Sequence, residues 1–213
     1  MVYSIGWKSE FKTYSKTTIV GPENALSTME FLHPEEVDSV AKIEGYMQMS
    51  QGYRVVAETA PKEIIWHDNR HLPDVPIGGG GISVVSERFR DLVERFEPGV
   101  HQFIPVDMYK AKADQPIARY YWFVVCKLID SNHPDHTTWK WDGDYPTKRG
   151  KWHFDVYASP PPKLVFNLEA IGSNHIWRDP YLDRGVTLCS DTFGKALLAE
   201  NLTSVSLREY EQI

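Results

Sequence analysis

The segment ISVVSERFRDLVERFEPGVHQFIPVDMY, residues 82–109, carries the clearest structural pattern in the chain. Its first four residues suit a short strand, and Ser86 can then cap a helix, with Glu87 at the positive end of the helix dipole. Pro98 and Gly99 end that helix, and an alternating strand follows. The apolar side chains of the helix recur at helical spacing and form one stripe: Phe89, Leu92, Val93 and Phe96. The segment therefore predicts a strand–helix–strand unit with its helix over about Ser86–Phe96.

A second segment, VTLCSDTFGKAL at residues 186–197, resembles ISVVSERFRDLV at residues 82–93. Ser190 corresponds to Ser86 and Phe193 to Phe89, so each copy has an apolar strand, a serine cap, an acid and an amphipathic helix. The second helix is expected over about Ser190–Asn201. The similarity indicates two like strand–helix–strand corners, although two serine-capped helices can also resemble each other by chance.

The rest of the chain contains more strand patterns than helix patterns. A helix is expected to begin near Pro34 in HPEEVDSVAKIEGYM. The run PIGGGG, residues 76–81, predicts a flexible joint, because it lacks both the Gly-Lys-Ser/Thr of a phosphate cradle and the third glycine of a dinucleotide fingerprint. The expected strands are TTIV (17–20), YRVVAET (53–59), KEIIWHDN (62–69), RYYWFVVCKLID (119–130), KWHFDVYA (151–158) and a run after the prolines at 160–162.

These elements predict an α+β fold, with mostly antiparallel strands in a mixed, twisted sheet and two main amphipathic helices. Residues 1–75 form an N-terminal region of uncertain structure that is expected to pack on the rest. Residues 76–213 form the main domain. No long polar linker separates the two regions, so one compact unit is expected.

Composition and charge narrow the classes of function. The chain has 213 residues, 42% of them hydrophobic, with a formal net charge of −6. Nucleic-acid binding needs a cationic face, and only the short run TKRGK is basic, so direct binding to DNA or RNA is disfavoured. No apolar run approaches a membrane span, and the N-terminus lacks the pattern of a signal peptide. Two cysteines in apolar runs, Cys126 and Cys189, suit a cytoplasmic protein, and the acidic charge suits a basic partner as well as plain solubility.

The segment HPDHTTWKWDGDYPTKRGKWHFD, residues 133–155, is rich in histidine, aspartate and tryptophan. Catalytic zinc sites often combine two histidines with a carboxylate, which gives four candidate metal ligands: His133, Asp135, His136 and His153. Against a metal site, Pro134 opposes a helix through HPDH, and the pattern His-Glu-x-x-His is absent. On an alternating strand, His153 lies opposite Trp152 and faces solvent. No cofactor is therefore predicted.

The same segment can instead be a long hairpin, because WDGD and YPTKRG are turn-forming. Exposed tryptophans beside aspartates would suit a basic protein partner, and the candidate contact residues are Trp139, Trp141, Asp142 and Asp144. The alternative is that both tryptophans fold back onto the sheet as a satellite core. In IIWHDNRHLPD, residues 64–74, a second candidate contact region contains Trp66, His67 and His71, with ordinary loop residues as the alternative.

Two stretches resemble the signatures of a known family. VVSERFRDLVERFEPGVHQFIPV, residues 84–106, with LPDV upstream at residues 72–75, is similar to the central signature of the Imm-eleven class of polymorphic-toxin immunity proteins. HIWRDPYLDRGVTLCSDTFGKALLAENLTSV, residues 175–205, resembles the second signature of that class. Residues 76–213 would then be the immunity-family domain.

This resemblance implies a cytoplasmic protein that binds and neutralises a cognate secreted toxin by forming a stoichiometric complex. The toxin would be encoded nearby and delivered by a contact-dependent route such as type VI secretion. The resemblance implies no enzyme activity, no catalytic residue and no cofactor. Two other classes stay open from the residues alone: a metal-dependent hydrolase, and an enzyme that reverses the toxin's modification, both using residues 133–155. Neither the toxin nor the oligomeric state can be inferred from the sequence.

Overall fold

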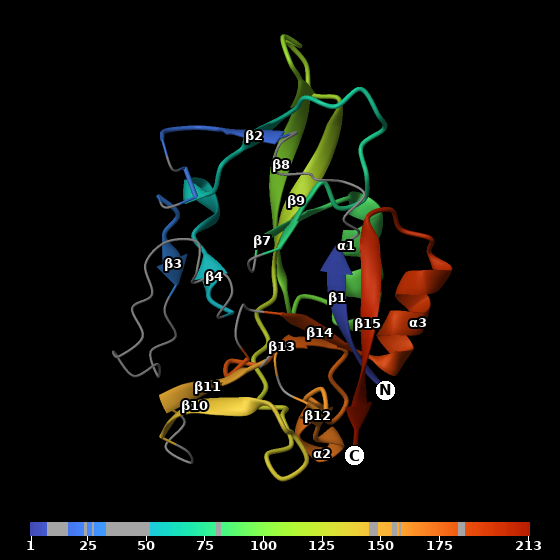
Figure 1. Ribbon diagram of the computed structural model, residues 1–213. Helices are drawn as coiled ribbons and strands as arrows, with labels where there is room; N and C mark the ends of the chain where they lie inside the picture. The colour runs from blue at the N-terminus through green and yellow to red at the C-terminus, as the bar shows by residue number, and fades with distance from the viewer. Residues whose placement is uncertain are drawn as a thin grey trace.

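The computed structural model describes residues 1–7, 17–23, 25–26, 28–32, 52–79, 82–144, 149–154, 157, 159–182 and 186–213. Within these residues the strands form two larger sheets and two antiparallel pairs of strands (Figure 1). The predicted α+β fold with mixed strand directions is confirmed, although the strands divide between two sheets. The helix expected to begin near Pro34 lies outside the described residues.

The first sheet has six strands in the order β2-β5-β8-β9-β7-β6. β5 and β8 run parallel, and all other neighbours are antiparallel. β9 lies at the centre, as its apolar run predicts. Residues 77–79 of the expected flexible joint form an edge strand instead, because they pair with β7. The strands are β2 (Thr17–Val20), β5 (Glu63–Trp66), β6 (Ile77–Gly79), β7 (Ile82–Val85), β8 (Gln102–Lys110) and β9 (Ala118–Val124).

Side chains alternate between the two faces of this sheet. On one face, Trp122 of β9 and Trp66 of β5 belong to a single buried cluster. On the other face, Phe123 packs against the helix α1 (Glu87–Phe96), with 5.5 Å between its ring centroid and that of Phe89. The centre of the sheet is therefore covered on both sides.

The second sheet joins the two ends of the chain, in the order β12-β15-β1-β14-β13. β1 lies between β14 and β15 and is antiparallel to both, so the N-terminal strand completes a sheet otherwise built from residues 165–212. The strands are β1 (Val2–Trp7), β12 (Val165–Phe166), β13 (Ile176–Arg178), β14 (Thr187–Ser190) and β15 (Val205–Gln212).

Residues 127–133, which follow β9, pair with both edges of the second sheet. Arg178 of β13 exchanges two backbone hydrogen bonds of 2.9 Å with the start of this segment. The carbonyl of Val165 in β12 accepts another, of 2.8 Å, from its far end. One continuous segment thus covers both edges and closes the sheet on itself. The single strand predicted at residues 119–130 is accordingly divided between two sheets.

The two predicted main helices are α1 and α3 (Asp191–Ala199). Ser86 and Ser190 cap them, each accepting a hydrogen bond of 3.3 Å from the backbone N–H of the phenylalanine three residues later. Both helices lie between two strands, β7–α1–β8 and β14–α3–β15, so the two corners expected from the sequence similarity are present. The predicted apolar stripe is also confirmed, since α1 buries Phe89, Leu92 and Val93. A shorter helix, α2 (Leu168–Ile171), follows β12.

Two antiparallel pairs of strands complete the described structure. β10 (Lys140–Asp144) and β11 (Arg149–His153) pair with each other, and β11 is tied to the second sheet's region by a backbone hydrogen bond of 2.7 Å from Trp152 to Tyr181. β3 (Phe31–Leu32) and β4 (Arg54–Val55) pack on the first sheet's buried cluster. Among the described helices, none has the length and apolar content needed to cross a membrane.

Candidate interaction surfaces

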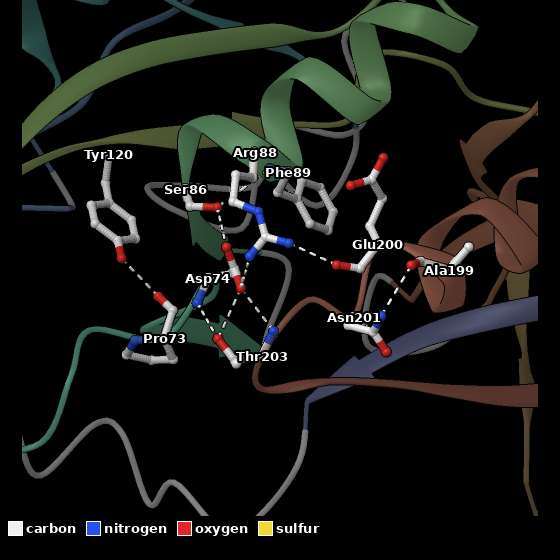
Figure 2. A network of polar contacts seen from close by, with 10 residues as sticks. All are labelled: Pro73, Asp74, Ser86, Arg88, Phe89, Tyr120, Ala199, Glu200, Asn201 and Thr203. Carbon is white, nitrogen blue, oxygen red and sulfur yellow. Dashed lines mark hydrogen bonds and ion pairs between the residues drawn. The ribbon is translucent and has the colours of Figure 1, made fainter.

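Asp74, in the stretch LPDV, is the centre of a buried polar network that joins the two sequence signatures (Figure 2). Its carboxylate accepts hydrogen bonds from the Ser86 hydroxyl at 2.7 Å and from the Thr203 backbone N–H at 2.8 Å. The Thr203 hydroxyl donates to the same carboxylate at 2.9 Å and accepts from the Asp74 N–H at 2.7 Å. Arg88 lies 3.4 Å from the carboxylate, but its side chain is 57% exposed, so solvent screens that ion pair. The hydrogen bonds are what make burial of this carboxylate tolerable.

The two capped helices meet beside this network, where Figure 2 shows Arg88 extending towards Glu200. Arg88 donates to the Glu200 carbonyl at 2.7 Å, and Arg95 forms an ion pair with the Glu200 carboxylate. Phe96 of α1 packs edge to face on Phe193 of α3, with 5.2 Å between ring centroids. The signature residues therefore hold the two strand–helix–strand corners against each other.

A second buried carboxylate, Asp179, fixes the segment that closes the second sheet. Its Oδ2 accepts hydrogen bonds from the backbone N–H groups of Ser131 and Asn132, at 2.7 and 3.2 Å, and from both of their side chains. Its Oδ1 accepts from the Tyr181 N–H at 2.8 Å. Burial raises the pKa of Asp179 to about 6, although the surrounding donors oppose the rise. The Asp179 carboxylate thus holds the backbone of residues 131–132 and of Tyr181 in place.

Glu97, just after α1, links three further elements. Its carboxylate lies 2.6 Å from Nε2 of His101 and accepts a hydrogen bond of 2.6 Å from the His175 N–H. Nδ1 of His175 in turn lies 2.9 Å from the hydroxyl of Ser190, the cap of α3. Burial acts to raise the pKa of Glu97, but the contacts with His101 and His175 outweigh it, so the pKa is lowered.

The two cysteines are free thiols. Nδ1 of His101 accepts a hydrogen bond of 3.2 Å from the backbone N–H of Cys126, while the Cys126 thiol donates to the Val124 carbonyl at 3.4 Å. Burial raises the pKa of Cys126 and of Cys189. A thiol with a raised pKa is a poor nucleophile at neutral pH, so His101 and Cys126 do not form an activated pair.

The candidate metal ligands are only partly brought together. His133 and His136 meet in a turn, with 4.5 Å between ring centroids, while Asp135 is exposed beside them. His153 lies on β11, where its Nε2 is 3.6 Å from the carboxylate of Asp142. In the part of the chain that the structure describes, no group of three or more His, Cys, Asp or Glu side chains is placed to hold a metal ion.

The predicted contact set in the hairpin is split between two faces. Trp139 and Trp141 are half-buried and pack against the third core cluster, and Trp141 contacts Trp152 at 5.1 Å between ring centroids. Asp142 lies on the opposite face of β10 with its side chain 80% exposed. The side chain of Asp144 lies outside the described residues. Strand alternation causes this split, because neighbouring residues point to opposite faces.

The second predicted contact region is also divided. Trp66 is 0% exposed, within the core of the first sheet, so its side chain offers no surface to a partner. Its indole N–H donates to the Arg70 carbonyl at 3.3 Å. His67 and His71 are exposed, and Nε2 of His67 lies 2.8 Å from the hydroxyl of Thr18 on β2.

Sequence reasoning did not single out the polar centres at Asp74, Asp179 and Glu97. For Asp179 the sequence does contain a signal, because Pro180 follows it. A residue before a proline favours extended backbone, and an aspartate there often accepts hydrogen bonds in a turn. Asp74 and Glu97 carry no local pattern that separates a buried carboxylate from an exposed one.

The carboxylates of Asp74, Asp179 and Glu97 are engaged in contacts within the fold, which is an α+β fold of two larger sheets and two pairs of strands. A comparison with protein-family models matches residues 22–212 to an immunity protein family (Imm11). The chain therefore belongs to this immunity protein family, as the signatures at residues 84–106 and 175–205 indicated. A search of curated proteins gives no match.

Proposed function

We propose that this protein neutralises a cognate secreted toxin by forming a stoichiometric complex with it in the cytoplasm of the producing cell. The toxin belongs to a polymorphic toxin system and arrives by a contact-dependent route such as type VI secretion. The protein acts as an inhibitor and not as an enzyme. Its net charge of −6 favours a toxin with a basic surface.

The match of residues 22–212 to the immunity family is the observation that carries this proposal. The internal role of the signature residues supports it further. Asp74, Ser86 and Asp179 are engaged in hydrogen bonds within the fold, which suits a scaffold whose specificity resides on its surface. A specific interface would bury about 800 Å² on this protein.

Co-expression tests the proposal directly. The toxin encoded beside this gene should be lethal when produced alone and harmless when produced with this protein. An inactivated form of that toxin should co-purify with it at one-to-one stoichiometry. Absence of a toxin gene beside this one, or lack of protection in co-expression, would contradict the proposal.

The same experiment separates sequestration from enzymatic reversal. Protection by sequestration needs at least one copy of this protein per toxin, so it should fail when the toxin is in excess. Reversal of the toxin's modification would instead protect at substoichiometric amounts and without a detectable complex. Metal analysis of protein purified without added metal tests the hydrolase alternative, which predicts one bound ion per chain.

A further inference from the structure

Among the residues that the structure describes, α1 is the helix that packs on the Phe123 face of the six-stranded sheet, and it covers only part of that face. On β9 that face is occupied by Tyr121 and Phe123, and α1 covers them: Phe89 packs on Phe123, and the guanidinium of Arg90 lies 4.5 Å from the Tyr121 ring centroid. Along β2, β5 and the end of β8 the same face continues beyond α1. Because alternate residues of these strands belong to the opposite core, the positions between them must point to this continuing face.

We call this continuing part the outer face, and it comprises Val20, Glu63, Ile65, Asp107, Tyr109 and Arg119. Its residues stand in cross-strand register. Glu63 pairs with Val20 on one side and with Asp107 on the other, and Asp107 pairs with Arg119, so one row crosses four strands. Ile65 and Tyr109 form part of a second row. Since neighbouring strands lie about 4.8 Å apart, the first row spans roughly 14 Å, which suits the centre of a protein interface.

The outer face combines apolar and aromatic surface with solvent exposure. Val20 is 38% exposed, and Ile117, at the end of the β8–β9 turn, is 45% exposed. Ile65 and Tyr109 are half-buried. Tyrosine is enriched at the centres of interfaces, because its ring buries a large area while its hydroxyl stays hydrogen-bonded.

The outer face carries two carboxylates, those of Glu63 and Asp107, and only Asp107 has an ion-pair partner among the described residues. Asp107 is neutralised by Arg119, whose guanidinium donates to both carboxylate oxygens at 2.8 and 3.1 Å. The side chain of Glu63 is exposed, and its carboxylate forms no hydrogen bond or ion pair with any described residue. Tyr109 follows Asp107 by two residues on β8, so its ring lies in the row next to Glu63 and Asp107 on the same face. Desolvation raises the pKa of Tyr109, and the carboxylates of Glu63 and Asp107 add to the rise. The face therefore presents one unpaired carboxylate next to an aromatic ring.

Given the proposed function, on which this inference rests, we propose that the outer face is the docking surface for the toxin and that Glu63 pairs there with a lysine or arginine of the toxin beside Tyr109. A cation is the complement of an unpaired carboxylate on partly apolar ground, where desolvation on binding strengthens the pair. It also fits the net charge of −6. His67, whose imidazole contacts Thr18, borders the same face. It belongs to the second contact region predicted from the sequence.

Calorimetric titration with the inactivated toxin encoded beside the gene tests this assignment. Glu63→Arg should weaken binding by about a hundredfold or more, because it opposes two like charges. Tyr109→Ala should weaken it by about tenfold or more. Glu209→Arg is the matched control, since Glu209 is an exposed strand glutamate on β15 in the other sheet, and its affinity should stay within about twofold of the wild type. Glu63→Gln adds a readout specific to charge: its deficit should be largest at low salt and shrink as salt rises.

Each variant is first checked by thermal unfolding, and Glu63→Arg and Glu63→Gln keep the test decisive if Tyr109→Ala does not fold. Wild-type affinity in folded Glu63→Arg would overturn the assignment. So would loss of binding in Asp142→Lys, on the outward face of the hairpin, with the outer-face variants unaffected, because the hairpin would then be the contact. If the wild-type protein itself does not bind the toxin, the proposed function is wrong. If the wild type binds and the outer-face variants bind equally well, only the assignment of the docking surface is wrong.

Discussion

Asp74→Ala should destabilise the protein more than any loss of a surface charge. Asp74 is 7% exposed, and its carboxylate accepts three short hydrogen bonds, one from Ser86 and two from Thr203, and a longer one of 3.4 Å from the exposed Arg88. A hydrogen bond to a charged group contributes about 1.5–3 kcal/mol, but removing the carboxylate also removes the cost of burying it, so we expect a net loss of about 3–5 kcal/mol. For a chain of this size each kcal/mol corresponds to about 2–4 °C, so the unfolding midpoint should fall by roughly 6–20 °C.

The assay is reversible urea or thermal unfolding of the wild type, three single variants and one double variant. Asp107→Ala is the matched control, because Asp107 also pairs with an arginine, but its side chain is 28% exposed and that of Arg119 is 61% exposed. An exposed ion pair of this kind should cost less than about 1 kcal/mol. Thr203→Val completes a double-mutant cycle with Asp74→Ala, and the two substitutions should couple by about 1 kcal/mol or more.

Equal stability losses in Asp74→Ala and Asp107→Ala would refute this reasoning, since the buried network would then contribute no more than a surface pair. Strict additivity of Asp74→Ala and Thr203→Val would also count against it, because the two sequence signatures would not be joined at that point. Neither result depends on the toxin.

Four further outcomes are expected. Phe89→Ala should cost about 3–5 kcal/mol through cavity formation, since Phe89 is 0% exposed, and it should reduce protection only through the amount of folded protein measured in cells. Because the pKa of Glu97 is lowered in the folded protein, its carboxylate contributes stability above its ordinary pKa of 4.5, and that contribution is lost as the pH falls below 4.5; the stability gap between the wild type and Glu97→Gln should therefore be largest near neutral pH and narrow as the pH falls below 4.5. Replacing Trp139 and Trp141 together with alanine should lower the free energy of unfolding by about 2–4 kcal/mol, because both rings pack on the core, and an unchanged unfolding midpoint would show that they do not. Asp179→Ala should speed amide hydrogen exchange in the segment that closes the second sheet, while α1 keeps wild-type protection.

The two main helices could be predicted because their signals are local. A serine cap, an acid in the first turn and an apolar stripe within ten residues specify α1, and the same cap and acid specify α3. The central position of β9 follows from its unbroken apolar run. These features depend on neighbours in the chain, so a single sequence contains them.

The path of residues 127–133 could not be predicted, because it depends on strands more than 30 residues away in sequence. The apolar run at 119–130 shows no break where the chain leaves one sheet for the other. The same limit applies to Trp139 and Trp141, since alternation assigns them to one face of β10 without indicating which face meets the core. Only the position of the hairpin relative to the second sheet decides that.

The strand geometry separates the residues that hold the fold from those proposed to meet the toxin. On β5 and β8, Ile64, Trp66 and Met108 build the core, while Glu63 and Tyr109 point the other way. A substitution at Glu63 or Tyr109 therefore changes the outer face without opening a cavity in the cluster behind it. An immunity protein needs that independence, because it must match one toxin and not another on a common scaffold. Substitutions at outer-face positions should accordingly alter partner preference at little cost in stability, whereas substitutions at Asp74 or Ser86 should alter stability without redirecting specificity.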